Sequence, residues 1–131
     1  MNDNKSIIRE LFDAWSRHDI EHAATLISDQ CNSGGLTGFK QQLGALIEAM
    51  PDLSVTIKDI LGEGNKVATR IILRGTHLGS FLGFAPTGKS LTIKANHVYT
   101  LQDGLVIERY GQMDRLEVIG QMGLKMVPAE A

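Results

Sequence analysis

The sequence predicts an α+β fold, because apolar residues recur at helical spacing in its first half and at every second position in its second half. The pair Asp103-Gly104, the strongest hairpin signal in the chain, separates the last two alternating segments. Helices followed by an antiparallel sheet pack together on one face of that sheet. With 131 residues, the chain has room for one domain with a single core, which we place at residues 1–131.

Three helices are expected in the first half, at about residues 3–18, 20–27 and 38–50. The first has one apolar stripe, formed by Ile7, Ile8, Leu11, Phe12 and Trp15. A polar, glycine-rich loop at 28–37 separates the second helix from the third. The third helix is expected to start after Thr37 and to end before Pro51, because the residue before a proline disfavours helical geometry.

Four strands are expected in the second half, around residues 53–57, 67–73, 91–101 and 105–113. A long loop at 75–89 precedes the third strand, and a short helix follows the fourth. One face of the third strand is apolar except for one residue: Leu91, Ile93, Ala95, His97, Tyr99 and Leu101. Its other face is polar, with Thr92, Lys94, Asn96 and Thr100, and we expect a homodimer to form through that sheet face.

Composition narrows the classes of function. The net charge is −2 and no block of Lys or Arg stands out, so a nucleic-acid surface is not indicated. The longest apolar runs are far shorter than the ~20 residues of a membrane span, and the N-terminal residues do not resemble a signal peptide. The single cysteine, Cys31, has no metal-binding motif near it. We therefore expect a cytoplasmic protein that needs no metal or cofactor.

Several short motifs are spread over the chain: Phe12 with Trp15, Pro51-Asp52-Leu53, Gly75-Thr76-His77-Leu78-Gly79, Pro86-Thr87-Gly88-Lys89, Asp103-Gly104, and Asp114 followed by Gln121-Met122-Gly123. Together with the order of the elements, they resemble the SnoaL-like group of the nuclear-transport-factor-2-like superfamily, which includes small polyketide ester cyclases. The resemblance implies a cone-shaped fold, with three N-terminal helices packed on a curved antiparallel sheet, a short C-terminal helix and a pocket at the open end. In the cyclases of this group, an aspartate acts as general acid–base in an aldol closure without metal or cofactor.

Asp114 is the residue that the resemblance selects for catalysis. It also precedes Arg115-Leu116-Glu117, an Asp-x-x-Glu pattern typical of a helix N-terminus. An N-cap aspartate typically contributes about 1 kcal/mol by accepting main-chain N–H groups, and this role requires no catalysis. Asp114 is therefore either a catalytic base or a helix cap.

His97 is the second catalytic candidate, because an imidazole on an apolar strand face must find a partner or destabilise the fold. It can equally be a core histidine bonded to a main-chain carbonyl. If Asp103-Gly104 is a two-residue turn, His97 lies opposite Tyr110, and Tyr110, Gln112 and Asp114 share its face. At ~3.3 Å per residue, Asp114 would lie roughly 13 Å from the partner of His97, at the other end of one pocket.

Six further residues are candidates for contact with a ligand: Trp15, Met50, His77, Tyr99, Tyr110 and Gln112. Tyr110 and Gln112, like His97, could stabilise an enolate oxygen, and Trp15 could form part of an apolar wall. His77 is either a donor at the pocket rim or a turn histidine that holds its loop. Met50 is otherwise a core residue.

The predicted function is a cofactor-independent cyclase-type reaction on a small apolar carbonyl compound. The cyclases carry a further acidic residue in the last strand, whereas this chain has Tyr110-Gly111-Gln112 there. That difference favours an alternative, a non-catalytic module that binds a hydrophobic ligand or a protein partner. Two other reactions of the superfamily have different requirements. Ketosteroid isomerisation needs a tyrosine and two acids. Epoxide hydrolysis needs an arginine between two acids, and Arg70, Arg74 or Arg109 could supply that arginine.

Overall fold

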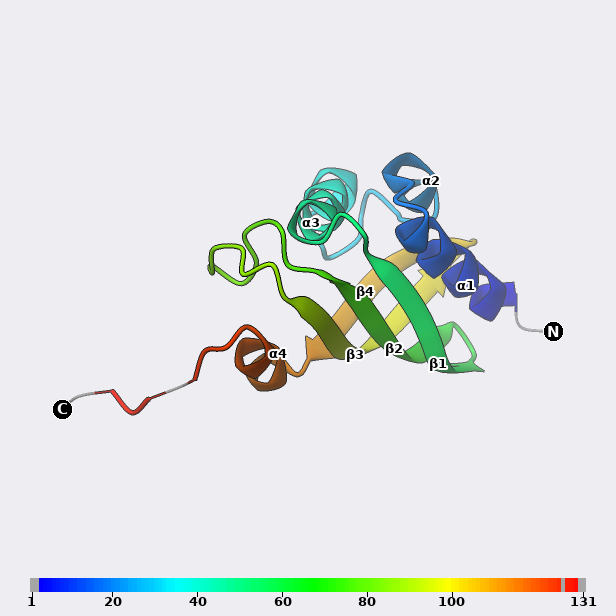
Figure 1. Ribbon diagram of the computed structural model, residues 1–131. Coiled ribbons are helices and arrows are strands. Elements are labelled where there is room, and N and C mark those ends of the chain that lie inside the picture. The colour runs from blue at the N-terminus through cyan, green and yellow to red at the C-terminus, as the bar shows by residue number, and fades with distance from the viewer. Residues whose placement is uncertain (1–2, 126, 130–131) are drawn as a thin grey trace.

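A computed structural model describes residues 3–125 and 127–129 (Figure 1). Its helices are α1 (Asp3–Ser16), α2 (Ile20–Ala24), α3 (Gly35–Ala49) and α4 (Arg115–Gln121). Its strands are β1 (Ser54–Glu63), β2 (Lys66–Thr76), β3 (Ser90–Gln102) and β4 (Leu105–Met113). Among the described helices, none has both the length and the apolar character needed to cross a membrane.

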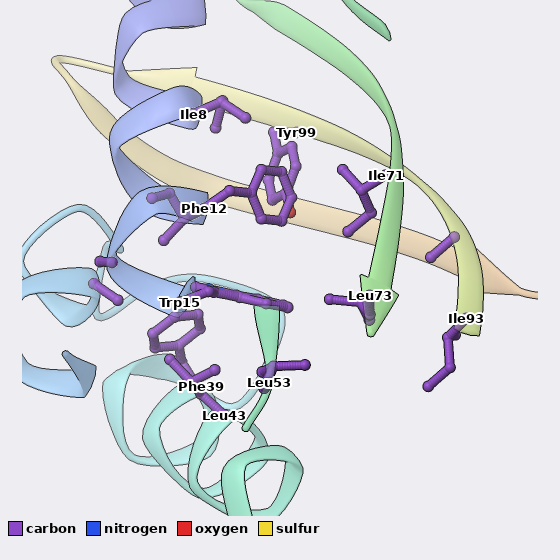
Figure 2. Packing of buried hydrophobic residues seen from close by; sticks show 14 of the residues in the cluster. Ile8, Phe12, Trp15, Phe39, Leu43, Leu53, Ile71, Leu73, Ile93 and Tyr99 are labelled. Carbon is purple, nitrogen blue, oxygen red and sulfur yellow. The ribbon is translucent and has the colours of Figure 1, made fainter. Parts of the chain in front are cut away.

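The four strands form one antiparallel sheet in the order β1-β2-β3-β4. Helices α1, α2 and α3 lie on one side of this curved sheet, and α4 lies beyond the end of β4, next to β3 (Figure 1). The core fills the space between the two layers, where Phe12 and Trp15 of α1 meet Tyr99 of β3 and Leu73 of β2 (Figure 2). The predicted α+β class, with three helices on a curved sheet and a short last helix, is confirmed.

Two helix boundaries differ from the prediction. Helix α3 begins at Gly35, within the predicted loop, because Gly34 has a φ of 85° and turns the chain into the helix. Helix α2 ends at Ala24, and Ile27 forms a single bridge to Val106 of β4. Helix α2 starts where predicted, at Ile20. The carboxylate of Asp19 caps it by accepting the main-chain N–H of His22 at 3.0 Å.

The hairpin between β3 and β4 contains a β-bulge that the sequence did not predict. Gln102 pairs with Leu105, as the Asp-Gly turn requires, but the register shifts by one residue between Thr100 and Leu101, where Ile107 is the extra residue of β4. His97 consequently lies opposite Gly111, and the prediction of Tyr110 as its partner was wrong. Since side chains alternate along a strand, the shift moves every residue of β4 beyond the bulge to the opposite face.

The C-terminal motif of the chain attaches α4 to the exposed edge of β3. The side-chain amide of Gln121 donates to the main-chain oxygen of Thr92 at 2.8 Å, and its oxygen accepts the N–H of Thr92 at 2.7 Å. The N–H of Asp114 donates to the oxygen of Lys94 at 3.2 Å. These bonds replace the strand pairing that β4 no longer provides, and they fix where Asp114 lies.

Candidate functional site

A cavity of about 610 Å³ lies between α3, the concave face of the sheet and the loop after β2. Most of its wall is apolar: Trp15, Phe39, Leu43, Ala45, Leu46, Leu73, Phe81, Leu82, Ile93, Ala95 and Met113. The polar part consists of Ser33, Gln42, Ser80, His97, Arg109, Gln112 and Arg115, with Gly111 among them. A mostly apolar cleft of several hundred Å³ with a few polar groups is the usual form of a small-molecule site.

The charges in this lining all have one sign. Arg109 and Arg115 are cations, His97 is titratable, and none of the described residues of the lining is an Asp or a Glu. The cavity is therefore electropositive, although the whole chain carries a net charge of −2. A cation beside low-dielectric walls acts more strongly on a bound molecule than the same charge in water.

The imidazole of His97 lies among aromatic rings on the cavity floor. It stacks on Tyr99, with ring centres 5.7 Å apart, and lies edge-on to Trp15 at 6.5 Å. Its Nδ1 is buried without a hydrogen-bond partner. Its Nε2 has no hydrogen-bond partner among the described residues and, unlike Nδ1, is not buried, so a molecule in the cavity can reach this nitrogen.

The surroundings of His97 keep its ring neutral. Burial, and to a smaller extent the positive charge of Arg109, together lower its pKa from about 6.5 to about 4. At neutral pH the imidazole is therefore uncharged, and Nε2 can accept or donate a proton depending on the tautomer. Because Arg109 contributes to the low pKa, an anion bound beside Arg109 would raise the pKa of His97.

Arg109 is held in place by neutral groups on every side. Its guanidinium carbon lies 5.9 Å from the ring centre of Trp15 and 5.5 Å from that of Phe39, within the range of a cation–π interaction. Its Nη1 donates to the side-chain oxygen of Gln42 at 3.1 Å. Asn32 brackets its main chain, accepting the N–H at 2.9 Å and donating to the oxygen at 3.1 Å.

Asp114 lies outside the cavity, contrary to the expectation that it shares a face with His97. It is exposed on the other side of the sheet, beside Lys94, Asn96 and Arg70. Its carboxylate caps α4 by accepting the N–H of Glu117 at 3.1 Å. Of the two roles that the sequence left open, the geometry fits the helix cap, because the bulge in β4 turned the residue away from His97.

The other predicted ligand contacts divide into two groups. Trp15 lines the cavity, and Gln112, which pairs with Asn96, borders both the cavity and the outer-face pocket that contains Asp114. Tyr110 is 63% exposed and points away from the cavity, for the same reason as Asp114. Tyr99 is fully buried beneath His97, and burial raises the pKa of its hydroxyl above the usual range, although the nearby guanidinium of Arg109 acts in the opposite direction. It supports the cavity floor without lining it.

His77 and Met50 also lie outside the cavity lining. His77 is completely buried, and its Nδ1 lies 3.0 Å from the hydroxyl of Thr87 and accepts the N–H of Thr87 at 3.3 Å. It therefore holds the two ends of the 77–89 loop together, which is the second of the two roles considered for it. Met50 is a core residue packed against Gly75, where a β-carbon would lie 3.1 Å from its sulfur.

The sequence did not single out Arg109, Arg115, Phe39 or Gln42 as site residues, and it considered Arg109 only for epoxide hydrolysis. Helical spacing places Phe39 and Gln42 on adjacent turns of α3, but it does not show which face meets the sheet. The predicted register, with Tyr110 and Gln112 on the face of His97, leaves Arg109 on the opposite face, and the bulge that reverses this has no local signal. The register shift in the β3–β4 hairpin places Arg109 in the cavity, and the sequence does not reveal that shift.

The described part of the chain contains no group of three His, Cys, Asp or Glu side chains able to hold a metal ion. A sequence model of the SnoaL-like polyketide cyclase family matches residues 5–122. The chain belongs to this family. No curated protein matches it.

Solved structures of similar proteins share its architecture. AclR from Streptomyces galilaeus is 26% identical, with a TM-score of 0.82 over 96% of this chain and 85% of AclR. TsrD from Streptomyces laurentii is 21% identical, with a TM-score of 0.85 over 94% and 98% of the two chains. A SnoaL-like polyketide cyclase from Agrobacterium tumefaciens is 17% identical, with a TM-score of 0.83 over 94% and 100%. The nuclear-transport-factor-2-like fold expected from the motifs is thereby confirmed.

Proposed function

We propose that this SnoaL-like protein is a cofactor-independent, cyclase-type enzyme that performs acid–base chemistry at a carbonyl group, with His97 as the proton-transfer residue. The observation that carries the proposal is a neutral imidazole with a free Nε2 on the floor of an apolar cavity. The substrate would be a small, mostly hydrophobic molecule, since the wall offers aromatic and aliphatic contacts over most of its area.

In the proposed reaction, Nε2 of His97 removes a proton from the carbon next to a carbonyl. The resulting enolate oxygen is stabilised by the positive field of Arg109 and Arg115, which both line the cavity. The enolate carbon then attacks a second carbonyl of the same molecule and forms a C–C bond, and the imidazolium returns its proton to the new alkoxide. No atom is lost, so the ring closure needs no other reactant.

The low pKa of His97 in the empty cavity makes it a weak base. A substrate that places negative charge beside Arg109 offsets the positive charge that lowers this pKa, and the imidazole then becomes a better base. The site would thus gain basicity only when it is occupied. A positioned acid–base group typically accelerates proton transfer by about 10²–10⁴-fold.

The experiment is deuterium exchange at the carbon next to the carbonyl of 2-tetralone, a compact bicyclic ketone, in D₂O. Wild-type protein should accelerate the exchange above the buffer rate, and His97→Gln should return it to that rate. His22→Gln is the matched control, because His22 is on the surface of α2 and pairs with Glu10. Exchange that is equal in the wild type and in His97→Gln would overturn the proposal.

One observation favours a second function, a binding module without catalysis. None of the described residues lining the cavity is a carboxylate, so the aspartate that the cyclases use as acid–base has no counterpart there. Under this alternative, the cavity holds its ligand and His97 only donates or accepts a hydrogen bond. Tight binding of 2-tetralone without any acceleration of exchange would support it.

We also propose that the protein works as a cytoplasmic homodimer. The support is the outer sheet face, where Val98 is 43% exposed and its cross-strand partner Tyr110 is 63% exposed. Thr92, Lys94 and Asn96 surround these two residues with polar groups. An apolar centre with a polar rim is the usual composition of such an interface.

A further inference from the structure

Within residues 3–125 and 127–129, the guanidinium of Arg109 has no anionic partner, although it lies partly buried at the cavity wall. The ion pairs of these residues involve Arg17, Arg70, His22 and three lysines, but neither Arg109 nor Arg115. A partly buried charge is normally paired, since burial without a partner costs free energy. The rings of Trp15 and Phe39 and the amide of Gln42 hold Arg109 without neutralising it.

The contacts of Arg109 also leave most of its donors unused. A guanidinium has five N–H groups; one of them, on Nη1, is bonded to Gln42, and the group also lies close enough to the hydroxyl of Tyr99 to interact with it. The two aromatic rings beside the guanidinium and its bond to Gln42 restrict its position, so the remaining donors are held near the cavity before any ligand arrives. A preoriented, unpaired fork beside an apolar cavity is the arrangement that binds a planar anion with two oxygens.

From this geometry we infer that the molecule bound in the cavity carries a carboxylate, which the guanidinium of Arg109 binds, while its apolar body fills the space below α3. The inference rests on the proposed function, because it names the class of molecule that the same cavity accepts. Arg115, which also lines the cavity and has no ion pair, adds a second positive charge on the same side.

A carboxylate fits this lining better than a phosphate. Phosphate sites use several cations or a glycine-rich turn with main-chain N–H groups, and the lining contains no lysine and no such turn. A single carboxylate needs one fork of two parallel N–H groups. The mostly apolar wall likewise favours a molecule with one charged end.

The test compares two probes of equal shape, 1-naphthoate and 1-naphthamide, by calorimetry or by NMR shift titration. In wild-type protein the carboxylate should bind about 10- to 100-fold more tightly than the neutral amide, the ratio expected for charge-assisted hydrogen bonds. Arg109→Gln should remove this preference while leaving naphthamide binding within about twofold. Arg109→Lys should keep part of it, since the charge remains but the fork is lost.

Arg74→Gln is the matched control, because Arg74 is exposed on the other face of β2 and does not line the cavity. It should leave the preference for naphthoate unchanged. If Arg109→Gln does not fold, the inference is tested by the ratio of naphthoate to naphthamide affinity in the wild type and in Arg109→Lys. Equal affinity for both probes in the wild type would overturn the carboxylate inference but leave a small-molecule cavity intact. Binding of neither probe would overturn both the inference and the proposed function.

Discussion

The imidazole of His97 lies against the main chain of Gly111 on the neighbouring strand, so closely that a β-carbon on residue 111 would lie 2.7 Å from Nε2. Only glycine leaves room for the ring there. Gly111→Ala should therefore displace His97 and destabilise the protein by about 1–3 kcal/mol, the usual cost of overpacking. Urea unfolding measures this loss, and the NMR signals of the His97 ring report its displacement.

Gly120→Ala serves as the control for that substitution. Gly120 is in α4, and a β-carbon there would meet no atom within 4 Å. Because alanine has the higher helix propensity, this variant should be as stable as the wild type or more stable, by up to about 1 kcal/mol. Equal stability of the two variants would show that His97 does not occupy the space above Gly111.

The stability of the protein should depend on pH through His97. Folding lowers the pKa of His97 from about 6.5 to about 4, so the unfolded chain binds more protons between these pH values. This contribution to stability is complete above about pH 6.5 and is lost as the pH falls toward about 4. A shift of this size corresponds to about 3 kcal/mol. Urea unfolding between these pH values measures the free energy of unfolding, which should depend less steeply on pH in His97→Gln than in the wild type. Equal pH dependence in the two proteins would contradict the low pKa of His97.

Asp114→Ala should affect stability and leave the cavity unchanged. Loss of the cap on α4 should cost about 1 kcal/mol, because the N–H of Glu117 loses its acceptor. Asp114→Ser keeps an acceptor at the same place and should restore most of the stability. Naphthoate binding and tetralone exchange should be equal to wild type in both variants. A loss of exchange in Asp114→Ser, with stability intact, would restore Asp114 as a catalytic residue.

Much of the fold could be predicted from the sequence because its signals are local. The apolar stripe around Trp15 and the alternation in β2 and β3 predict a helix and strands by their periods. The Asp103-Gly104 turn was also placed correctly. Each of these features depends only on neighbours within a few positions along the chain.

The site could not be predicted to the same extent, because one non-local feature decides which side chains face His97. The bulge at Ile107, opposite Thr100 and Leu101, has no sequence signal of its own, yet it exchanges Tyr110 and Gln112 for Arg109 and Gly111 as the residues next to His97. His97 itself was identified correctly as the exceptional residue of its strand face, since its own strand contains no bulge against β2. The cavity wall from α3 depends on how two layers pack, which a helical period does not determine.

The proposed homodimer predicts a mass of about twice 14.3 kDa in sedimentation analysis. Val98→Glu places a charge in the apolar centre of the outer sheet face and should yield the monomer. Leu78→Glu is a control of the same chemistry, on an exposed residue of the loop after β2, outside the sheet. A monomeric wild type at high concentration would contradict the dimer, and dissociation caused equally by both substitutions would contradict its location.

The most direct test of the central claim is an NMR titration of the His97 ring, first in free protein and then with saturating 1-naphthoate. The free ring should titrate with a pKa near 4, and the bound anion should raise this pKa, because it offsets the charge of Arg109. A pKa near 6.5 in the free protein that the ligand leaves unchanged would show that His97 is a solvated histidine, remote from any ligand, and would contradict the proposed chemistry.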